Sequence, residues 1–217
     1  MRTLLFTLIF LNSIFGETLN MTWESWYNAA TNLVLLESIE PTIKKDIKYA
    51  TNDNFTESVI YESDHLFLHK DVALRLKKVQ EYLKELGFGL KVWDGYRPLF
   101  AQQLLWNHTP DEKYVSPPNL GGRHTRGTAV DLTLINLSTG QECKMPTCFD
   151  DFTVKAHREY ADLDEEILHN VLLLEKAMTE IGGFEPYPYE WWHFDIKGWK
   201  EHTPLNISFS QLVMINE

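Results

Sequence analysis

The clearest periodic pattern in the chain runs from Lys70 to Leu86 and predicts an amphipathic helix. Its apolar residues recur at steps of four and three, which places them on one helical stripe: Val72, Leu76, Val79, Leu83 and Leu86. Gly87 stands where a C-terminal cap belongs. A similar pattern follows Asp164, a typical N-cap, and its predicted buried stripe comprises Ile167, Val171, Leu174, Met178 and Ile181. Gly182 and Gly183 end this second helix.

Short apolar runs between these helices predict strands. The segment Thr128–Ile135 is rich in β-branched residues and alternates, so that Asp131 shares a face with Ala129 and Thr133, away from the larger apolar side chains. Further strands are predicted over Leu33–Leu36, Ile43–Thr51 as an edge strand, Leu90–Trp93 and Trp191–Ile196. Another helix is expected over Leu99–Trp106, with Pro98 in its first turn.

The order of these elements predicts an α+β fold. Strands and helices follow one another until residue 136, where an irregular connection runs to residue 163 before the last helix and strand. A connection of this length usually serves a site. We therefore expect one domain with a mostly antiparallel central sheet, packed helices and a metal site in a cleft.

Composition narrows the class of protein. The 217 residues are 44% hydrophobic, enough for one compact domain, and the net charge of -11 with no basic cluster excludes a nucleic-acid groove. Arg2 and the apolar run Leu4–Leu11 predict a signal peptide over residues 1–16, a mature domain over 17–217, and a secreted or periplasmic location. No other segment is predicted to meet the membrane, and the sequence leaves the oligomeric state open.

Cys143 and Cys148 are five positions apart in the irregular connection. An oxidising compartment would allow a small disulfide between them, but two free thiols are an equal alternative. Two thiolates alone cannot complete a zinc site.

The candidate chemistry gathers in two motifs far apart in the chain. His124 and Asp131 lie in a glycine-containing turn and the strand after it, and His193 lies in the final aromatic strand. Two imidazoles and a carboxylate are a common ligand set for one catalytic Zn²⁺ per chain. Glu190 precedes His193 by three positions, so it must lie just outside the regular strand, where it can act as a general base.

Arg97 is the candidate for stabilising a tetrahedral oxyanion, because a guanidinium stays charged and offers several donors. Asp94, three residues earlier, is expected to hold that guanidinium in place. A purely structural salt bridge is the alternative role for Arg97.

Three motifs resemble the D-alanyl-D-alanine dipeptidases, the VanX-type zinc peptidases: D-G-Y-R-P at 94–98, R-H-T-R-G-T-A-V-D-L-T-L at 123–134 and E-W-W-H-F at 190–194. Two lesser matches are Y-A-T-x-x-N-F, which begins at Tyr49, and M-P-T-C-F-D, which ends at Asp150. The resemblance implies a zinc dipeptidase acting on small D-amino-acid dipeptides. It implies that His124, Asp131 and His193 bind the zinc, that Glu190 is the general base and that Arg97 stabilises the transition state. It also implies substrate contacts for Asp150, Asp94 and Tyr49.

One departure concerns Gly122, where the family usually has a serine whose hydroxyl could bind substrate. Its loss puts recognition of the substrate carboxylate in question. Two alternative functions stay open: the sister activity of a D,D-carboxypeptidase on longer peptidoglycan stem peptides, and a non-catalytic zinc-bearing domain like the related hedgehog signalling fold.

Overall fold

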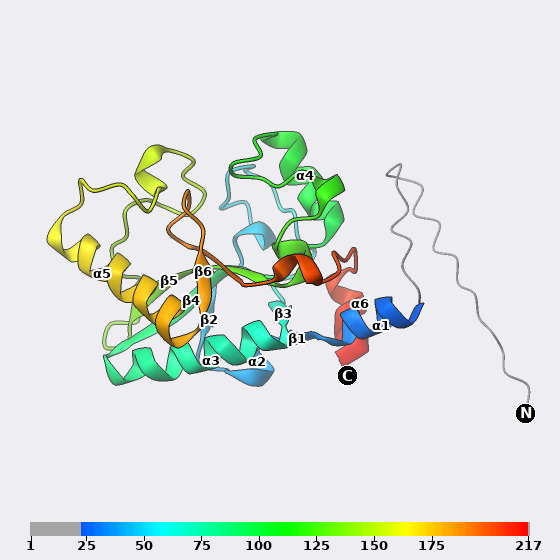
Figure 1. The fold of residues 1–217 in the computed structure, drawn as a ribbon, viewed down its shortest axis with the longest axis horizontal. Coiled ribbons are helices and arrows are strands. Elements are labelled where there is room, and N and C mark those ends of the chain that lie inside the picture. The colour runs from blue at the N-terminus through cyan, green and yellow to red at the C-terminus, as the bar shows by residue number, and fades with distance from the viewer. Residues whose placement is uncertain (1–22, 217) are drawn as a thin grey trace, which may run out of the picture.

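The computed structural model describes residues 23–216, and their strands form a five-stranded sheet in the order β2–β4–β5–β7–β6 (Figure 1). Its strands are β2 (Lys44–Lys45), β4 (Phe88–Asp94), β5 (Ala129–Asn136), β7 (His193–Ile196) and β6 (Phe184–Pro186). Only the β2–β4 pairing is parallel within this part of the chain. The predicted α+β fold with a mostly antiparallel sheet is therefore confirmed. A separate two-stranded sheet pairs β1 (Leu33–Leu35) with β3 (Phe67–His69).

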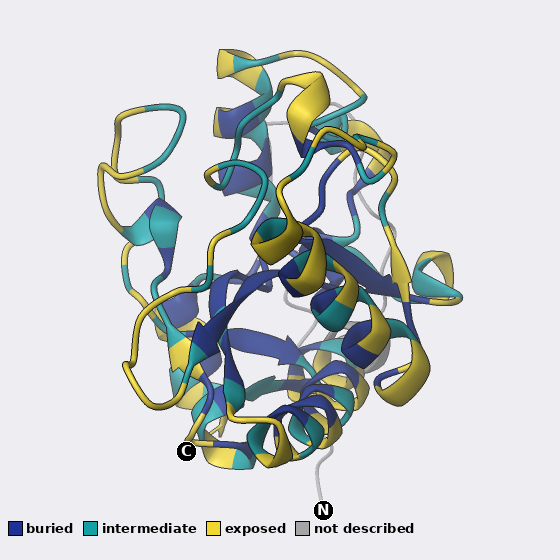
Figure 2. Ribbon diagram, turned by 90° about the vertical axis from the view of Figure 1, so that its left-hand side faces the viewer, coloured by how far each residue is buried: buried dark blue, intermediate teal, exposed yellow. Residues whose placement is uncertain are grey.

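The helices lie around these sheets. They are α1 (Trp23–Thr31), α2 (Leu36–Ile39), α3 (Lys70–Glu85), α4 (Leu99–His108), α5 (Glu165–Lys176) and α6 (Phe209–Asn216). The helix α3 packs against β4, and the π-helical turn Ala177–Ile181 that extends α5 packs against α3. The three inner strands of the central sheet, β4, β5 and β7, are mostly buried, whereas the outer sides of the helices are exposed (Figure 2).

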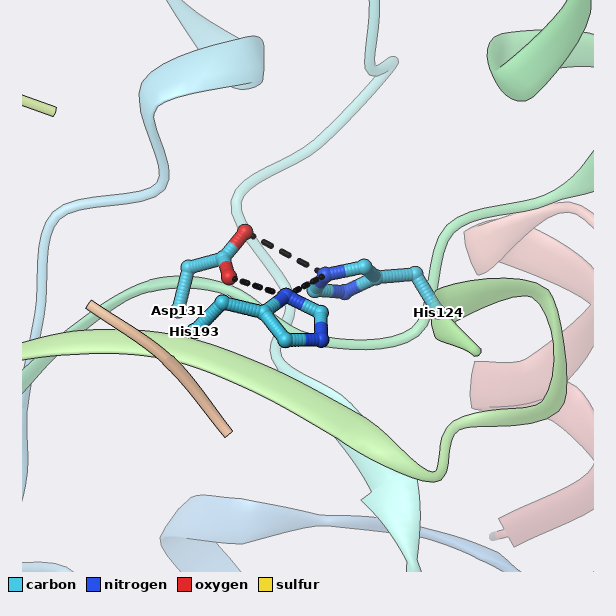
Figure 3. Close-up of side chains that lie close together, drawn as sticks. All are labelled: His124, Asp131 and His193. Carbon is cyan, nitrogen blue, oxygen red and sulfur yellow. Dashed lines mark hydrogen bonds and ion pairs between the residues drawn. The ribbon is translucent and has the colours of Figure 1, made fainter. Parts of the chain in front are cut away.

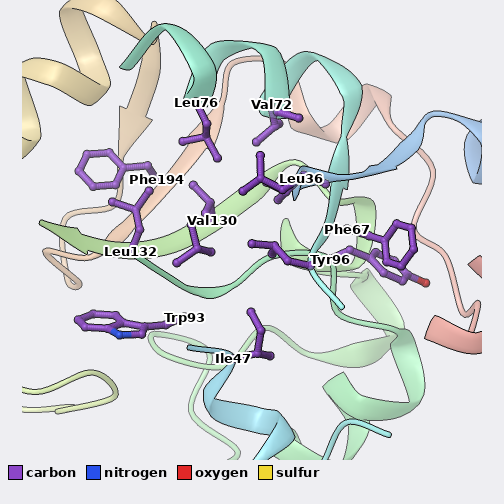
Figure 4. Close-up of a cluster of buried hydrophobic side chains, with 14 of the residues drawn as sticks. Leu36, Ile47, Phe67, Val72, Leu76, Trp93, Tyr96, Val130, Leu132 and Phe194 are labelled. Atoms are coloured by element: carbon purple, nitrogen blue, oxygen red, sulfur yellow. The ribbon is translucent and has the colours of Figure 1, made fainter. Parts of the chain in front are cut away.

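The hydrophobic core lies between α3 and one face of the central sheet. Val72 and Leu76 point from α3 toward Val130, Leu132 and Phe194, and all five are fully buried (Figure 4). Burying one such side chain contributes about 1.5–3 kcal/mol. On the other side of the strands lie Trp93 and Ile47, beneath the loops that cover the second face.

The two long amphipathic helices are confirmed, with corrections at their ends. Leu86 and Ile181 were predicted to be buried but are 47% and 38% exposed. Ile167 and Val171, also assigned to the buried stripe, are only half-buried. Leu86 is the C-cap residue of α3, where the chain already leaves the helix. Ile181 ends the π-helical turn, whose wider winding moves later residues off the α-helical stripe.

Several strand and cap predictions also need correction. The first strand ends at Leu35, because Leu36 begins α2. The predicted edge strand shrinks to Lys44–Lys45, since residues 48–50 form a 3₁₀ turn that buries Tyr49. The last strand starts at His193, because the Trp191 amide donates to Ala156 of the long connection instead of to a strand. Pro98 caps α4 from the position before its first residue.

The predicted signal peptide lies outside the described residues. Among the residues that are described, no helix has the length and apolar character needed to cross a bilayer. Cys143 and Cys148 are free thiols, so the structure favours the alternative without a disulfide.

Candidate metal centre and active site

Strand pairing places three side chains, two carboxylates and one imidazole, in one row across the sheet. Asp131 of β5 lies opposite His193 of β7 and, on its other side, opposite Asp94 of β4. A bulge between Val92 and Asp94 shifts the β4 register at this point. Bulges of this kind re-aim side chains next to active sites. Asp131 and His193, 62 positions apart in the sequence, are thereby immediate neighbours.

His124 reaches this row from a 3₁₀ turn, His124–Arg126, directly before β5. Gly127 ends the turn with φ +65°, and a Cβ there would lie 2.4 Å from Leu33 and 2.9 Å from the His69 amide. Only glycine therefore fits this tight approach. The turn is also joined to the end of β4, because the Arg97 amide donates to the His124 carbonyl.

The three predicted ligands face a common point (Figure 3). Nε2 of His124 lies 3.2 Å from Nδ1 of His193, and that nitrogen lies 2.9 Å from Oδ1 of Asp131. The second oxygen of Asp131 is 3.3 Å from Nε2 of His124. All three side chains are buried, and their ligand atoms lie within 4.8 Å of one another.

The surroundings of the two imidazole nitrogens that point away from the common point fit a metal centre. Nδ1 of His124 donates to the Gly95 carbonyl at 2.8 Å, which leaves the lone pair of Nε2 facing the common point. Nε2 of His193 is buried without a hydrogen-bond partner in the described chain, 3.5 Å from Oδ2 of Asp195. Such outer contacts orient metal-binding imidazoles. Two nitrogens and one carboxylate suit a divalent cation such as zinc.

Glu190 lies in the turn before β7, outside the regular strand as predicted. Its Oε2 lies 3.8 Å from Nδ1 of His193, beside the common point of the three candidate ligands. Burial is the largest cause that raises the pKa of Glu190 to about 8; His193 opposes this shift and Asp131 adds to it. A carboxyl with a raised pKa can both accept and return a proton near neutral pH.

Arg97 projects into the same cavity and is held from behind by Asp94. Nε and Nη2 of Arg97 donate to Oδ2 of Asp94 at 3.1 and 2.7 Å. The other oxygen of Asp94 accepts from Tyr61 and from the Gly95 amide. Asp94 is fully buried and does not line the cavity. The structure thus places it where it positions Arg97 and not where it would touch a substrate.

Asp150 and Tyr49 meet on another wall of the cavity, although 101 positions separate them. The Tyr49 hydroxyl donates to Oδ2 of Asp150 at 2.9 Å, and its ring lies 5.1 Å from the guanidinium carbon of Arg97. Burial first, and then repulsion from Asp131, raises the pKa of Asp150 well above its usual value. Asp150 also has φ +58°, a left-handed backbone conformation that is uncommon for residues other than glycine.

The structure adds contributors that sequence reasoning missed. Gln102 accepts from Nη1 of Arg97 at 3.0 Å, and Tyr187 and Arg123 line the cavity. Arg158, from the long connection, donates to the carbonyls of Tyr187, Trp191 and His193 and so fixes the turn that carries Glu190. Arg123 is the first residue of the motif at 123–134, and Gln102 follows Arg97 by only five positions, so both could have been noticed. Tyr187 and Arg158 carry no local signal, because tertiary packing places them here.

A group of two histidines and an aspartate, with a separate glutamate and an arginine on one cavity of an α+β domain, defines the class of metal-dependent hydrolases. A sequence model of the D-ala-D-ala dipeptidase family of peptidases matches residues 29–211. The chain belongs to this family and is a metallopeptidase.

Curated relatives agree with this assignment. The chain is 38% identical over 180 residues to the D-alanyl-D-alanine dipeptidase of Escherichia coli K12, covering 83% of this chain and 92% of the relative. It is 34% identical to the enzyme of the same name from Enterococcus faecalis V583, covering 75% of this chain and 90% of the relative. For the Streptomyces coelicolor enzyme the identity is 32%, over 76% and 92% of the two chains. The resemblance drawn from the three motifs is therefore confirmed.

Proposed function

We propose that this protein is an exported, zinc-dependent dipeptidase that hydrolyses D-Ala-D-Ala or similar D-amino-acid dipeptides released from peptidoglycan. The observation that carries the proposal is the common cavity lined by His124, Asp131 and His193 together with Glu190 and Arg97. The substrate class rests on the family and on the names of its relatives.

His124, Asp131 and His193 would hold the zinc. When bound, the ion supplies Lewis-acid polarisation of the substrate carbonyl and acidifies water. Glu190 accepts a proton from the attacking water and delivers it to the departing amine, a double role that its raised pKa favours. Arg97 stabilises the negative charge that develops on the carbonyl oxygen, and Asp94 keeps the guanidinium in place.

Asp150 would bind the free ammonium group of the substrate, with Tyr49 orienting the carboxyl. The positive charge of the ammonium opposes the burial that raises the pKa of Asp150, so the carboxyl would lose its proton when the dipeptide binds. An acylated nitrogen carries no charge for this pair, so a dipeptide would be preferred over a longer chain. The test is a hydrolysis panel of D-Ala-D-Ala, L-Ala-L-Ala and N-acetyl-D-Ala-D-Ala with zinc-loaded protein. We expect rapid cleavage of the first substrate alone.

The matched variants for the catalytic step are Glu190→Gln and Glu185→Gln. The first removes the proposed base and should lower kcat about 10²–10⁴-fold while about one zinc per chain is retained. The second makes the same chemical change at an exposed position of β6 and should leave kcat unchanged. Full turnover by Glu190→Gln would disprove this mechanism.

The nearest alternative function is D,D-carboxypeptidase action on longer stem peptides. One observation favours keeping it: a second, larger cavity adjoins the first and shares Phe55 and Asp150 with it. If Asp150 selects dipeptides, Asp150→Asn should lose most D-Ala-D-Ala hydrolysis. If the protein instead cleaves stem peptides, the variant should keep its rate on a pentapeptide that ends in D-Ala-D-Ala. The remaining alternative, a non-catalytic hedgehog-like domain, is not supported, because the chain belongs to a peptidase family.

Export is the second component of the proposal. It is supported by Arg2 and the apolar run Leu4–Leu11 in the sequence, and it would place the enzyme in the periplasm or outside the cell. Mass spectrometry of the mature protein should find an N-terminus near residue 17. An intact Met1 in the purified protein would contradict cleavage.

A further inference from the structure

The cations that line the candidate active-site cavity differ in how far their nitrogens are already engaged. These cations, in the part of the chain that the structure describes, are Arg97, Lys113 and Arg123. All three nitrogens of Arg97 donate within the protein, to Asp94 and Gln102. For Arg123 only Nε has an acidic partner among the described residues, Oδ2 of Asp195 at 2.7 Å, and its N–H is not aligned for a hydrogen bond.

Arg123 is also held rigidly by aromatic rings. Its guanidinium carbon lies 5.0 Å from the centre of the Tyr187 ring and 4.8 Å from that of Trp199. Cation–π contacts with two rings restrict the guanidinium, while neither terminal nitrogen has a hydrogen-bond or ion-pair partner in the described residues. The side chain is 28% exposed. A fixed guanidinium with two free terminal nitrogens suits a carboxylate.

A hydroxyl group lines the same cavity beside Gly122, the chain neighbour of Arg123. Ser116 lines it, and the Ser116 carbonyl accepts from Nε2 of Gln102 at 2.7 Å, which anchors the residue. No hydrogen bond engages its hydroxyl within residues 23–216. Gly122, next to Arg123, makes room for it: a Cβ at residue 122 would lie 3.1 Å from Cβ and 3.2 Å from Oγ of Ser116. The hydroxyl missing at position 122 is thus available from Ser116.

We propose that Arg123 and the Ser116 hydroxyl bind the C-terminal carboxylate of the dipeptide, an inference that rests on the proposed function. Asp150, which also lines this cavity, would then bind the ammonium end, so that both charged ends of a zwitterionic dipeptide are paired within one cavity. A substrate with an amidated C-terminus lacks the negative charge that Arg123 binds.

The test is a cycle that combines variants with two ligands, D-Ala-D-Ala and its C-terminal amide. Affinities are measured calorimetrically on zinc-loaded protein carrying Glu190→Gln, which removes turnover from the measurement. Adding Arg123→Gln should weaken binding of the acid about 10–100-fold and binding of the amide less than about 3-fold. Ser116→Ala should show the same pattern with a smaller loss for the acid.

Two controls separate recognition from a structural effect. Lys113→Gln removes another cation from the same cavity and should change the affinities for acid and amide equally. Adding Gly122→Ser to Ser116→Ala returns a hydroxyl to the same space and should restore part of the lost preference for the acid. Zinc content is measured for every variant, because Asp195 contacts both Arg123 and His193.

Equal losses for acid and amide in Arg123→Gln, or a wild-type-like preference for the acid, would overturn the inference. So would an acid-specific loss in Lys113→Gln. One combination of results would refute the proposed function alone. In it, the protein binds the acid more tightly than the amide and Arg123→Gln loses this preference, but the protein with Glu190 intact does not hydrolyse D-Ala-D-Ala.

Discussion

The two faces of the central sheet are both buried, yet they are built on different principles. On β5, Val130, Leu132 and Leu134 face the core under α3, and each is fully buried. The alternate residues Asp131 and Thr133 face the loops and are almost as deeply buried, at 3% and 1% exposure. Burial therefore does not distinguish the structural face from the functional one.

The difference lies in how well polar atoms are paired. Five buried polar side-chain atoms among the described residues lack a hydrogen-bond partner. Arg123 Nε and His193 Nε2 belong to the candidate active-site cavity, Trp93 Nε1 and Thr133 Oγ1 belong to residues of the adjoining second cavity, and Glu37 Oε2 belongs to neither. Unpaired buried polar groups cost about 1–3 kcal/mol each. The α3 face provides the apolar packing that stabilises the sheet, so the opposite face can keep groups positioned for a ligand.

The largest expected contrast comes from neighbouring residues on β5. Asp131→Asn should reduce zinc binding and lower hydrolysis on the order of 10³-fold or more, because a three-ligand site loses its only anion. Leu132→Ala should instead lower the free energy of unfolding by about 2–5 kcal/mol and leave the rate per folded molecule almost unchanged. Urea denaturation, metal analysis and initial rates measure both effects. Wild-type zinc content and rate in Asp131→Asn would break the comparison.

The next contrast uses one arginine from each face. Arg97→Lys should lower kcat about 10²-fold, because a lysine cannot reproduce the paired donors held by Asp94. Arg75→Lys makes the same change on α3, where the guanidinium donates to the carbonyls of Gly182 and Gly183. It should reduce stability by about 1 kcal/mol and leave kcat intact. Equal losses of kcat in both variants would contradict the assignment of Arg97.

The smallest expected effect is a pH dependence of stability. Since the folded pKa of Asp150 is raised above its unfolded value, the folded protein keeps a proton that the unfolded chain has lost. The contribution of Asp150 to the free energy of unfolding is fully present below about pH 4, the pKa of an unfolded aspartate, and is lost as the pH rises through the folded pKa. Asp150→Asn removes this loss, so its stability relative to wild type should rise as the pH is increased above about 4.

Urea midpoints in the presence of a chelator test this expectation. The exposed Asp162, in the same connection, provides the control variant Asp162→Asn, which should follow the wild-type pH profile. If the stability of Asp150→Asn also follows the wild-type pH dependence, the carboxyl of Asp150 has the same pKa in the folded and unfolded protein, and the expectation is wrong.

The sequence by itself determined the periodic elements and the ligand-bearing motifs. The α3 stripe, the alternation on β5 and the Asp164 cap, which accepts from the Ile167 amide at 2.9 Å, are local patterns that hydrophobic periodicity and capping specify. The position of Glu190 outside its strand also followed from side-chain parity. The ends of elements were less predictable, because Leu86, Ile181 and Trp191 depend on a cap, a π-helical turn and a contact with the long connection.

Only the tertiary structure decided which distant residues share the cavity. Sequence motifs indicated that Asp131 and His193 belong to one site, but the β5–β7 register places them side by side. Tyr49 and Arg158 reach the site through side-chain contacts across many residues of sequence, and local patterns carry no information about such contacts. The same reason applies to Ser116, whose hydroxyl lies in space that Gly122 leaves open.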